Sequence, residues 1–288
     1  MVIIMEHLLP NIREIALLSA DERIARIKKE YWIGYNRAEL SLNKLEELFN
    51  YPRKLRMKNM LIIGPSNNGK TMIVEKFRRS HLPYKSEDGG HEIIPVLMIQ
   101  MPSNPSVQRF YATLARALGS PISHYQSSAW HEAVVLDILK TTQTKILIID
   151  ELHNILAGNN TRQREFLNII RFLGNELQIS IVGVGIKDAY LAIRSDDQLE
   201  NRFDPFILPV WENDTDYIRL LSSFIKILPL QKISPLLDSN ISTMILERSE
   251  GTIGEISSLY HAASNHALES YYENLHHYQH RYYLAYRE

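Results

Sequence analysis

The hydrophobic residues of this chain form two patterns, short continuous runs and helical repeats. Five continuous runs, one of which has Pro95 near its start, lie at 60–63, 94–100, 146–149, 179–184 and 206–208. Runs of this length are typical of strands buried on both faces of a parallel sheet. Between them, apolar residues recur every three or four positions. This spacing predicts helices near 73–77, 110–118, 128–140 and 161–177. Such alternation predicts an α/β fold with a five-stranded parallel sheet between helices.

On both sides of this region the pattern is helical only. The N-terminal part holds a helix start at Ser19, where Glu22 completes a capping box. The C-terminal part holds three amphipathic stretches and a tail rich in tyrosine and histidine, which we interpret as an aromatic face for the lid or a partner. We therefore predict three parts: a helical segment (1–57), an α/β core (58–210), and a helical lid with a C-terminal tail (211–288).

Composition narrows the classes of function without naming one. The 288 residues are 45% hydrophobic, carry a formal net charge of −1 and include no cysteine. Near-neutral charge means that binding to a polyanion has to come from local patches. The absence of cysteine excludes disulfides and thiolate metal sites. The sequence has no apolar run of membrane-spanning length and its start does not match a signal peptide, so we expect a cytoplasmic protein without membrane contact.

The first strand leads into a motif that predicts phosphate binding. The eight residues after it fit G-x-x-x-x-G-K-[ST] without a mismatch: Gly64, Pro65, Ser66, Asn67, Asn68, Gly69, Lys70 and Thr71. Glycines let successive backbone N–H groups turn toward an anion, and the helix that follows adds its positive N-terminal end. Lys70 is expected to reach the β- and γ-phosphates of a nucleotide, and the Thr71 hydroxyl to bind Mg²⁺. The location between a strand and a helix favours a functional motif over a chance match.

A second motif follows the strand at 146–149. Asp150 and Glu151 stand at its C-terminal end, where open α/β sheets bind their ligands. We expect Asp150 to hold Mg²⁺ through its water shell, and Glu151 to orient the water that attacks the γ-phosphate. The 80 residues from Lys70 to Asp150 leave room for a further strand and helix. Together with the second carboxylate, that spacing favours ATPases with an additional strand over GTPases and small-molecule kinases.

These motifs together resemble the AAA+ ATPases, and among them the TniB/TnsC family of transposition regulators, which are relatives of the MuB type. The likeness covers nearly the whole chain. It rests on the two motifs above and on further segments: Trp32-Ile33-Gly34-Tyr35, Gln100-Met101-Pro102, Phe110-Tyr111, Leu118-Gly119-Ser120-Pro121, 149–158, 197–203 and Leu208-Pro209-Val210-Trp211. The phosphate motif alone occurs in many ATPases, whereas the combination is specific.

The resemblance implies an ATP-bound form that oligomerises on duplex DNA as a ring or a helical filament. It further implies that this form marks a target site with a target-selection protein and recruits or activates a DDE transposase. Arg202 matches the arginine that acts on the nucleotide of the neighbouring subunit, so it is expected to be catalytic together with Glu151. The DNA-facing positions of the family correspond to the stretch after the second strand and to the next helix. The candidates there are Ser103, Asn104, Gln108, Arg109, Arg116 and Ser120.

Two departures from the family pattern concern hydrolysis. Ile186 stands where a polar residue usually senses the γ-phosphate, and an aliphatic side chain cannot form a hydrogen bond. Glu255 stands where a second sensing arginine is common. Turnover of ATP is therefore expected to be slow or to depend on partners. Two other functions stay open at this point, an AAA+ remodeller or loader of proteins and an adaptor whose assembly is gated by nucleotide without hydrolysis.

Overall fold

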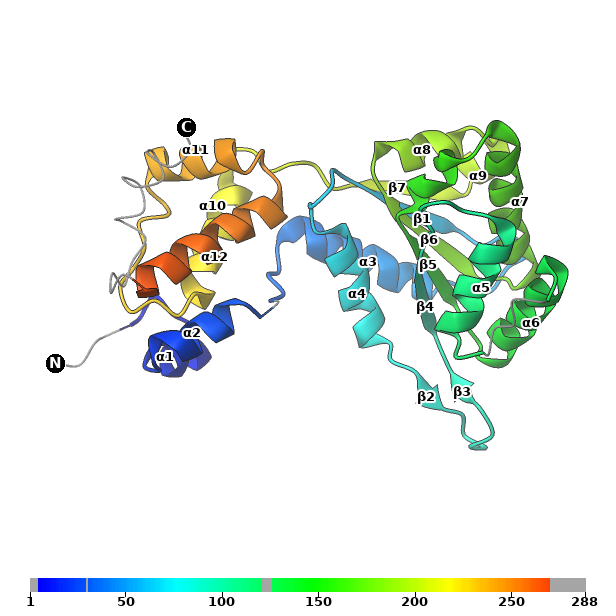
Figure 1. The fold of residues 1–288 in the computed structure, drawn as a ribbon, viewed down its shortest axis with the longest axis horizontal. Coiled ribbons are helices and arrows are strands. Elements are labelled where there is room, and N and C mark those ends of the chain that lie inside the picture. The colour runs from blue at the N-terminus through cyan, green and yellow to red at the C-terminus, as the bar shows by residue number, and fades with distance from the viewer. Residues whose placement is uncertain (1–4, 30, 121–125, 270–288) are drawn as a thin grey trace. The chain divides into compact units, whose positions relative to one another are not determined.

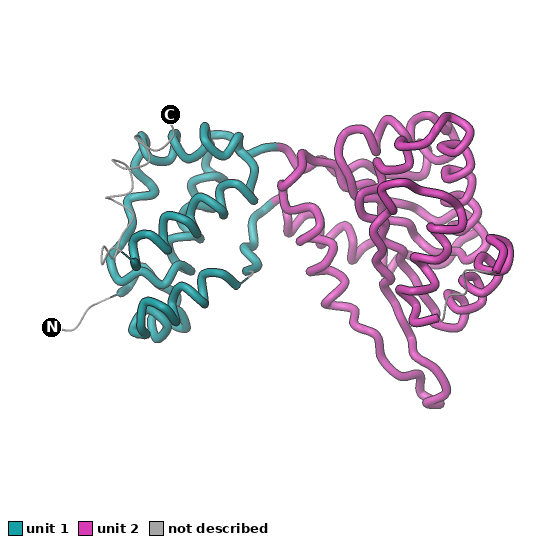
Figure 2. The backbone as a smooth tube through the Cα atoms, viewed as in Figure 1, with its two compact units in different colours: residues 1–36, 210–288 teal, residues 37–209 magenta. Residues whose placement is uncertain are grey.

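The chain forms two compact units in a computed structural model that describes residues 5–29, 31–120 and 126–269. Residues 37–209 make up one unit, and residues 1–36 together with 210–288 make up the other (Figure 2). The predicted tyrosine- and histidine-rich face of the tail lies outside the described residues. The predicted division of the chain into three parts, 1–57, 58–210 and 211–288, stays a prediction.

The unit of residues 37–209 is built on a five-stranded sheet with the order β4-β5-β6-β1-β7 (Figure 1). All four pairings between neighbouring strands are parallel. The strands are β1 (Asn59–Ile63), β4 (Val96–Gln100), β5 (Ile146–Asp150), β6 (Ser180–Gly185) and β7 (Phe203–Ile207). Because the strands are parallel, their C-terminal ends lie along one edge, which brings the ends of β1, β5 and β6 together. The predicted α/β class with a five-stranded parallel sheet is confirmed.

Two strand boundaries differ from those expected. The predicted run 94–100 begins as a strand only at Val96, since Pro95 has no N–H to donate to a ladder. The Pro95 carbonyl instead accepts from the N–H groups of Lys145 (2.9 Å) and Ile146 (3.2 Å). The strand predicted at 206–208 already begins at Phe203, because its first residues pair with the start of β1 at the edge of the sheet.

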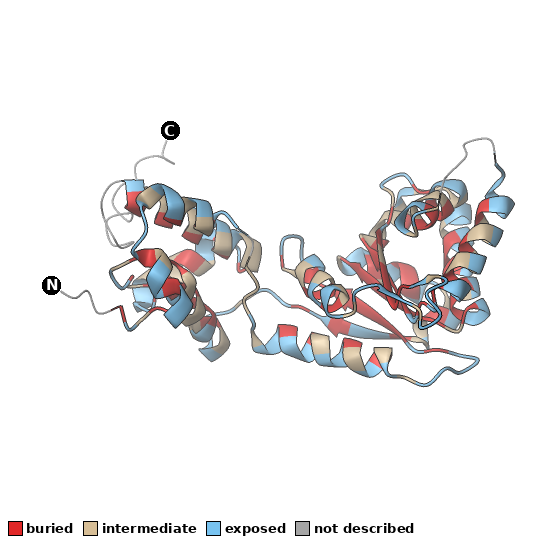
Figure 3. Cartoon of the chain, turned by 90° about the horizontal axis from the view of Figure 1, so that it is seen from below, coloured by how far each residue is buried: buried red, intermediate tan, exposed pale blue. Residues whose placement is uncertain are grey.

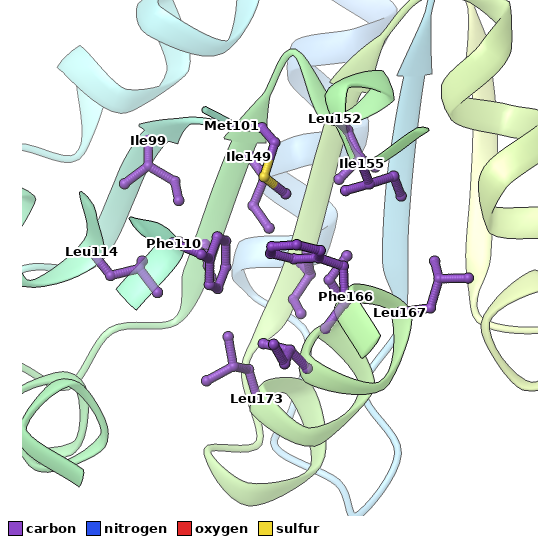
Figure 4. Close-up of a cluster of buried hydrophobic side chains, with 14 of the residues drawn as sticks. Ile99, Met101, Phe110, Leu114, Ile149, Leu152, Ile155, Phe166, Leu167 and Leu173 are labelled. Atoms are coloured by element: carbon purple, nitrogen blue, oxygen red, sulfur yellow. The ribbon is translucent and has the colours of Figure 1, made fainter. Parts of the chain in front are cut away.

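Helices cover both faces of this sheet (Figure 1). They are α3 (Asn36–Phe49), α4 (Lys70–Ser80), α5 (Val107–Ala117), α6 (Ser128–Thr141), α7 (Asn160–Glu176), α8 (Lys187–Arg194) and α9 (Asp197–Glu200), with a short 3₁₀ helix η1 (Leu152–Ala157). Side chains of a strand alternate between faces. Ile99 and Ile149 therefore join one cluster with Phe110 of α5 and Phe166 of α7, whose rings lie 5.8 Å apart (Figure 4). The central strands β1, β5 and β6 are buried over their whole length (Figure 3).

An antiparallel hairpin that the hydrophobic pattern did not predict lies between α4 and β4. Its strands are β2 (Tyr84–Lys85) and β3 (Glu92–Ile93). Both β2 residues are exposed, and Tyr84 is 57% accessible. Two paired residues on each strand are too few to leave a recognisable alternation in the sequence, which is why the pattern does not reveal the hairpin.

The second unit is helical in all its described elements. It contains α1 (Pro10–Ala16), α2 (Ala20–Ile27), α10 (Thr215–Ile227), α11 (Ser239–Arg248) and α12 (Ile253–Glu269). The capping box at Ser19 and Glu22 is present as predicted. Ile27 of α2 is fully buried in one cluster with residues of α10 and α12, where the rings of Phe224 and Tyr260 lie 4.5 Å apart. The N-terminal helix α2 thus shares a hydrophobic core with the C-terminal helices.

None of the helices among the described residues combines the length and the apolar character that crossing a membrane requires.

Candidate functional site

The predicted phosphate loop connects β1 to α4 at the C-terminal edge of the sheet. Gly69 caps the helix with a φ of 79°, a left-handed conformation that glycine adopts without steric cost, and α4 begins at Lys70. Asn67 has a φ of 57° and also turns the chain in the left-handed region. The loop therefore curls around the first turn of an 11-residue helix. Backbone N–H groups at such a helix start form a binding site for phosphate.

The loop is tethered to the end of β7. The buried side chain of Asn68 donates from Nδ2 to the carbonyl oxygens of Leu208 (3.1 Å) and Pro209 (2.8 Å). Gly64 approaches the same segment so closely that a Cβ atom at this position would lie 2.7 Å from the Leu208 oxygen. These contacts hold both ends of the loop against one backbone segment, which pre-organises it for a ligand.

Replacing Gly64 with alanine is expected to lower the free energy of unfolding by about 1–3 kcal/mol, the usual cost of overpacking. The new methyl group would meet a backbone oxygen, which cannot rotate away, so the loop must shift and nucleotide affinity should fall. Thermal unfolding with and without ATP measures both effects. Gly174→Ala is the matched control, because a Cβ on this buried glycine of α7 would make its nearest contact at 3.7 Å. Equal behaviour of the two variants would contradict the role given to the tether.

Lys70 lies inside the loop rather than in solvent. Its Nζ donates to the carbonyl oxygens of Gly64 (2.9 Å) and Pro65 (2.5 Å), and the residue is only 6% exposed. Burial lowers the pKa of its ammonium group, and the nearby carboxylates of Glu151 and Asp150 oppose this shift. The ammonium group attracts phosphate oxygens, while the two carboxylates repel them, so the site suits a polyphosphate that binds together with a cation.

Thr71 and Asp150 meet although 79 residues separate them in the sequence. The Thr71 hydroxyl donates to Oδ2 of Asp150 at 2.7 Å, and the other oxygen, Oδ1, accepts from the backbone N–H of Glu151 at 2.8 Å. A hydroxyl and a carboxylate at this spacing fit Mg²⁺, which takes one or two protein oxygens and completes its shell with water and phosphate oxygens. The described residues contain no group of three or more His, Cys, Asp or Glu side chains that could hold a metal by themselves.

Glu151 follows β5 directly and has a left-handed backbone with a φ of 53°. Its carboxylate is partly exposed, and its Oε2 lies 3.3 Å from Nε2 of His153. The carboxylate lies close enough to Lys70 of the phosphate loop to raise the pKa of its ammonium group. Lys70, Thr71, Asp150 and Glu151 therefore gather at the C-terminal edge of the sheet. His153 is a contact that sequence reasoning missed, although the residue stands within the motif run at 149–158.

Arg202 lies at the opposite edge of the sheet. Its carbonyl accepts from the N–H of Asn59 at the start of β1, whereas the N–H of Leu208 donates to Ile63 at the end of that strand. The six steps from Arg202 to Leu208 span about 20 Å of extended chain, which is longer than an arginine side chain. Arg202 and the phosphate loop of the same chain are therefore not brought together.

Positive charge gathers around Arg202. Burial lowers the pKa of its guanidinium group, and repulsion from Arg56 and Arg171 adds to this shift, while Asp196 opposes it. Nη1 of Arg202 donates to Oδ1 of Asn175 at 2.7 Å, which orients the side chain. A guanidinium group held in place among other cations suits an incoming anion.

The structure brings together only part of the predicted DNA-binding set. Ser103 and Asn104 are exposed after β4, and Nη1 of Arg109 in the first turn of α5 donates to the Asn104 carbonyl at 3.3 Å. Gln108 is exposed beside them. Arg116 is exposed in the last turn of the same helix, and Ser120 follows the end of this helix. The two arginines are seven positions apart along the helix, a rise of about 10 Å, so they present two separate charges.

Comparison with solved structures gives the class of fold. The chain is similar to Orc1 of Aeropyrum pernix, solved in complex with DNA (TM-score 0.57, 14% identity, covering 88% of this chain and 66% of that one). It is similar to Cdc6p of Pyrobaculum aerophilum (TM-score 0.60, 14% identity, covering 87% of this chain and 67% of that one). It is also similar to a Walker-type ATPase of Pyrococcus abyssi (TM-score 0.53, 14% identity, covering 82% of this chain and 68% of that one). The chain thus spans about two thirds of the length of these proteins. At this identity the likeness concerns the fold, which is that of the AAA+ ATPases.

Family comparison then identifies the chain. The model of the bacterial TniB protein matches residues 23–213, more than half of the sequence, so the chain belongs to the TniB family. The resemblance expected from the sequence motifs is confirmed. A search of curated proteins gave no significant match.

Proposed function

We propose that this chain is an ATPase that assembles on duplex DNA and regulates transposition. The observation that carries the ATPase proposal is the contact between Thr71 and Asp150, because it joins the two nucleotide motifs at the edge of the sheet where Lys70 and Glu151 also lie. Membership of the TniB family supports the role in transposition.

Different residues of the chain have different roles in the proposed hydrolysis. Backbone N–H groups of residues 64–71 and the Lys70 ammonium group bind the phosphates of ATP, while Thr71 and Asp150 hold Mg²⁺. When bound, Mg²⁺ neutralises the negative charge that develops on the phosphates. Glu151 orients and polarises the attacking water. Arg202, which lies far from its own loop, supplies its guanidinium group to the nucleotide of a neighbouring subunit.

These roles require assembly, because hydrolysis of one nucleotide uses the phosphate loop of one subunit and Arg202 of another. We propose that ATP stabilises a homo-oligomer, a ring or a helical filament, and that this oligomer binds the DNA backbone through Ser103, Asn104, Arg109, Arg116 and Ser120. A DDE transposase and a target-selection protein are its proposed partners, in the cytoplasm. Electron microscopy with duplex DNA, with and without ATP, tests the assembly and counts the subunits.

DNA binding is expected to depend steeply on salt and little on base sequence. Contacts to phosphates release condensed counterions, so each contact contributes about 0.9 to the slope of log affinity against log salt. The measurement is a salt titration with two unrelated duplexes, in ADP and in a non-hydrolysable ATP analogue. Affinity should be higher with the ATP analogue. Equal affinity in both nucleotide states, or strong preference for one duplex, would contradict the proposal.

Substitution of the two arginines of α5 tests whether these residues contact DNA phosphates. Arg109→Ala and Arg116→Ala should each reduce the salt slope by about 1 and weaken binding to both duplexes equally. Arg219→Ala is the control, since this arginine of α10 is 74% exposed and pairs with Asp216 at 3.0 Å.

A second candidate is an adaptor in which ATP sets the assembled state without being hydrolysed. The observation that favours it is Ile186, which begins the segment after β6 with an aliphatic side chain at the position where a polar sensor is expected. Glu255 in α12, in place of the second sensing arginine, also favours the adaptor. Nucleotide-dependent assembly without turnover, in the presence of DNA, would establish the adaptor over the ATPase.

A further inference from the structure

His153 lies beside the carboxylate that the proposed mechanism assigns to water activation. Its Nε2 is 3.3 Å from Oε2 of Glu151. The left-handed backbone of Glu151 and the 3₁₀ turn that begins at Leu152 fold the chain back, so a side chain two residues later reaches the carboxylate. Among the described residues, the Glu151 carboxylate has one side-chain partner in an ion pair or hydrogen bond, and this partner is His153.

The other side of the His153 ring is buried. Its Nδ1 has no hydrogen-bond partner among the described residues. A Cβ atom built on Gly185, the last residue of β6, would lie 3.3 Å from this Nδ1 and 2.9 Å from Cβ of Ala189. The ring thus occupies a space that exists because residue 185 has no side chain. The carbonyl of the same glycine accepts from the N–H of Gly64 at 3.2 Å, so this space adjoins the phosphate loop.

This environment selects one form of the imidazole ring. A proton on Nδ1 would be buried without an acceptor, and an unsatisfied buried donor costs free energy. A ring with its proton on Nε2 directs an N–H group at the Glu151 carboxylate, whereas the other tautomer would place the Nε2 lone pair against a carboxylate oxygen, which can only accept. A carboxylate that accepts from this donor through one oxygen has its second oxygen left for water.

We propose that His153 is a positioning residue that fixes the Glu151 carboxylate for the activation of water. It supplies, from the segment after β5, a polar contact in a site where Ile186 at the end of β6 cannot provide one. The proposal rests on the proposed ATPase function. Because it concerns orientation, loss of His153 should lower kcat and leave the KM for ATP nearly unchanged.

The test is steady-state ATP hydrolysis by the full chain with DNA. His153→Ala should lower kcat about tenfold or more, since displacing a reacting group by about 1 Å can cost up to 10²-fold. His153→Gln should restore turnover to within a few-fold, because the glutamine side chain is long enough to bring its amide nitrogen to the place of Nε2 and to donate to Glu151. His153→Leu keeps the volume without a donor and should resemble His153→Ala. His91→Ala, on the hairpin, is the matched control. If His153→Ala fails to fold, the Gln and Leu variants alone decide the question.

A double substitution separates this proposal from the function on which it rests. In a Glu151→Gln background, His153→Ala should have almost no further effect, because residues that act as a unit are not additive. If Glu151→Gln itself keeps the wild-type rate, the ATPase mechanism fails. If Glu151→Gln loses turnover but His153→Ala does not, only the role of His153 fails. Nitrogen NMR of the His153 ring should show the Nε2–H tautomer in the wild type, and the Nδ1–H tautomer would overturn the proposal.

Discussion

Replacing Arg202 with alanine is expected to lower ATP turnover about 10³-fold or more, the effect of removing an arginine finger. The physical reason is the separation within one chain: Arg202 lies at the N-terminal edge of the sheet and the phosphate loop at the C-terminal edge. Its charge can therefore reach a γ-phosphate only on a neighbouring subunit. Nucleotide affinity of the isolated subunit should stay unchanged. Turnover of the wild type should rise with protein concentration as subunits associate.

Mixed assemblies test whether the arginine acts between subunits. An Arg202→Ala subunit keeps its own phosphate loop, and a Lys70→Ala subunit keeps its arginine. Each variant alone should be inactive, whereas interfaces that combine the loop of the first with the arginine of the second should recover activity. The measurement is the hydrolysis rate against the mixing ratio, with co-assembly followed by light scattering.

Arg219→Ala is the control for Arg202, because its exposed ion pair with Asp216 contributes little to stability. Wild-type turnover by the Arg202 variant would exclude the catalytic role. Co-assembly of the two inactive variants without any recovery of activity would exclude action between subunits.

Replacing Glu151 with glutamine is expected to lower kcat by about 10²–10⁴-fold, the range that general acid–base groups contribute. Glutamine keeps the size of the side chain but loses the charge that polarises water. Binding of ATP should be retained, because Lys70 and the loop are unchanged. The variant should therefore accumulate in the assembled, ATP-bound form. Hydrolysis rates together with sedimentation in ATP measure both results.

Glu87→Gln on the exposed hairpin is the control for this substitution, since it removes the same charge outside the site. A Glu151→Gln variant that hydrolyses ATP at the wild-type rate would remove this carboxylate from the mechanism. A variant that neither binds ATP nor assembles would indicate that Glu151 supports the nucleotide site instead of the attacking water.

Much of the candidate site follows from local sequence. The loop at 64–71 lies between a strand and a helix as predicted, because its glycines and the apolar residues on either side are neighbours in the chain. Asp150 ends a fully buried strand for the same reason. The contact of His153 with Glu151 could not be predicted, because it depends on the left-handed backbone of Glu151 and the 3₁₀ turn after β5, which no apolar spacing reveals.

The predicted DNA-binding residues illustrate a second limit. Helical periodicity places Arg109 and Arg116 on one helix. It does not tell which side of the protein the two arginines face. The structure shows both exposed, with Arg109 against the loop at Asn104 and Arg116 two turns away. Which of them contacts DNA stays a prediction that the salt titration tests.

The sequence by itself determined the class of fold, the approximate positions of the five strands of the sheet and the identity of the phosphate loop. These features depend on the spacing of apolar residues and on a short motif, which are local properties of the chain. Only the tertiary structure decided the order of the strands, the contact of Thr71 with Asp150, the opposite location of Arg202 and the burial of Ile27 among C-terminal helices. Those arrangements join residues far apart in the sequence. They are set by which packing of all elements buries the most apolar surface, and no local pattern encodes that choice.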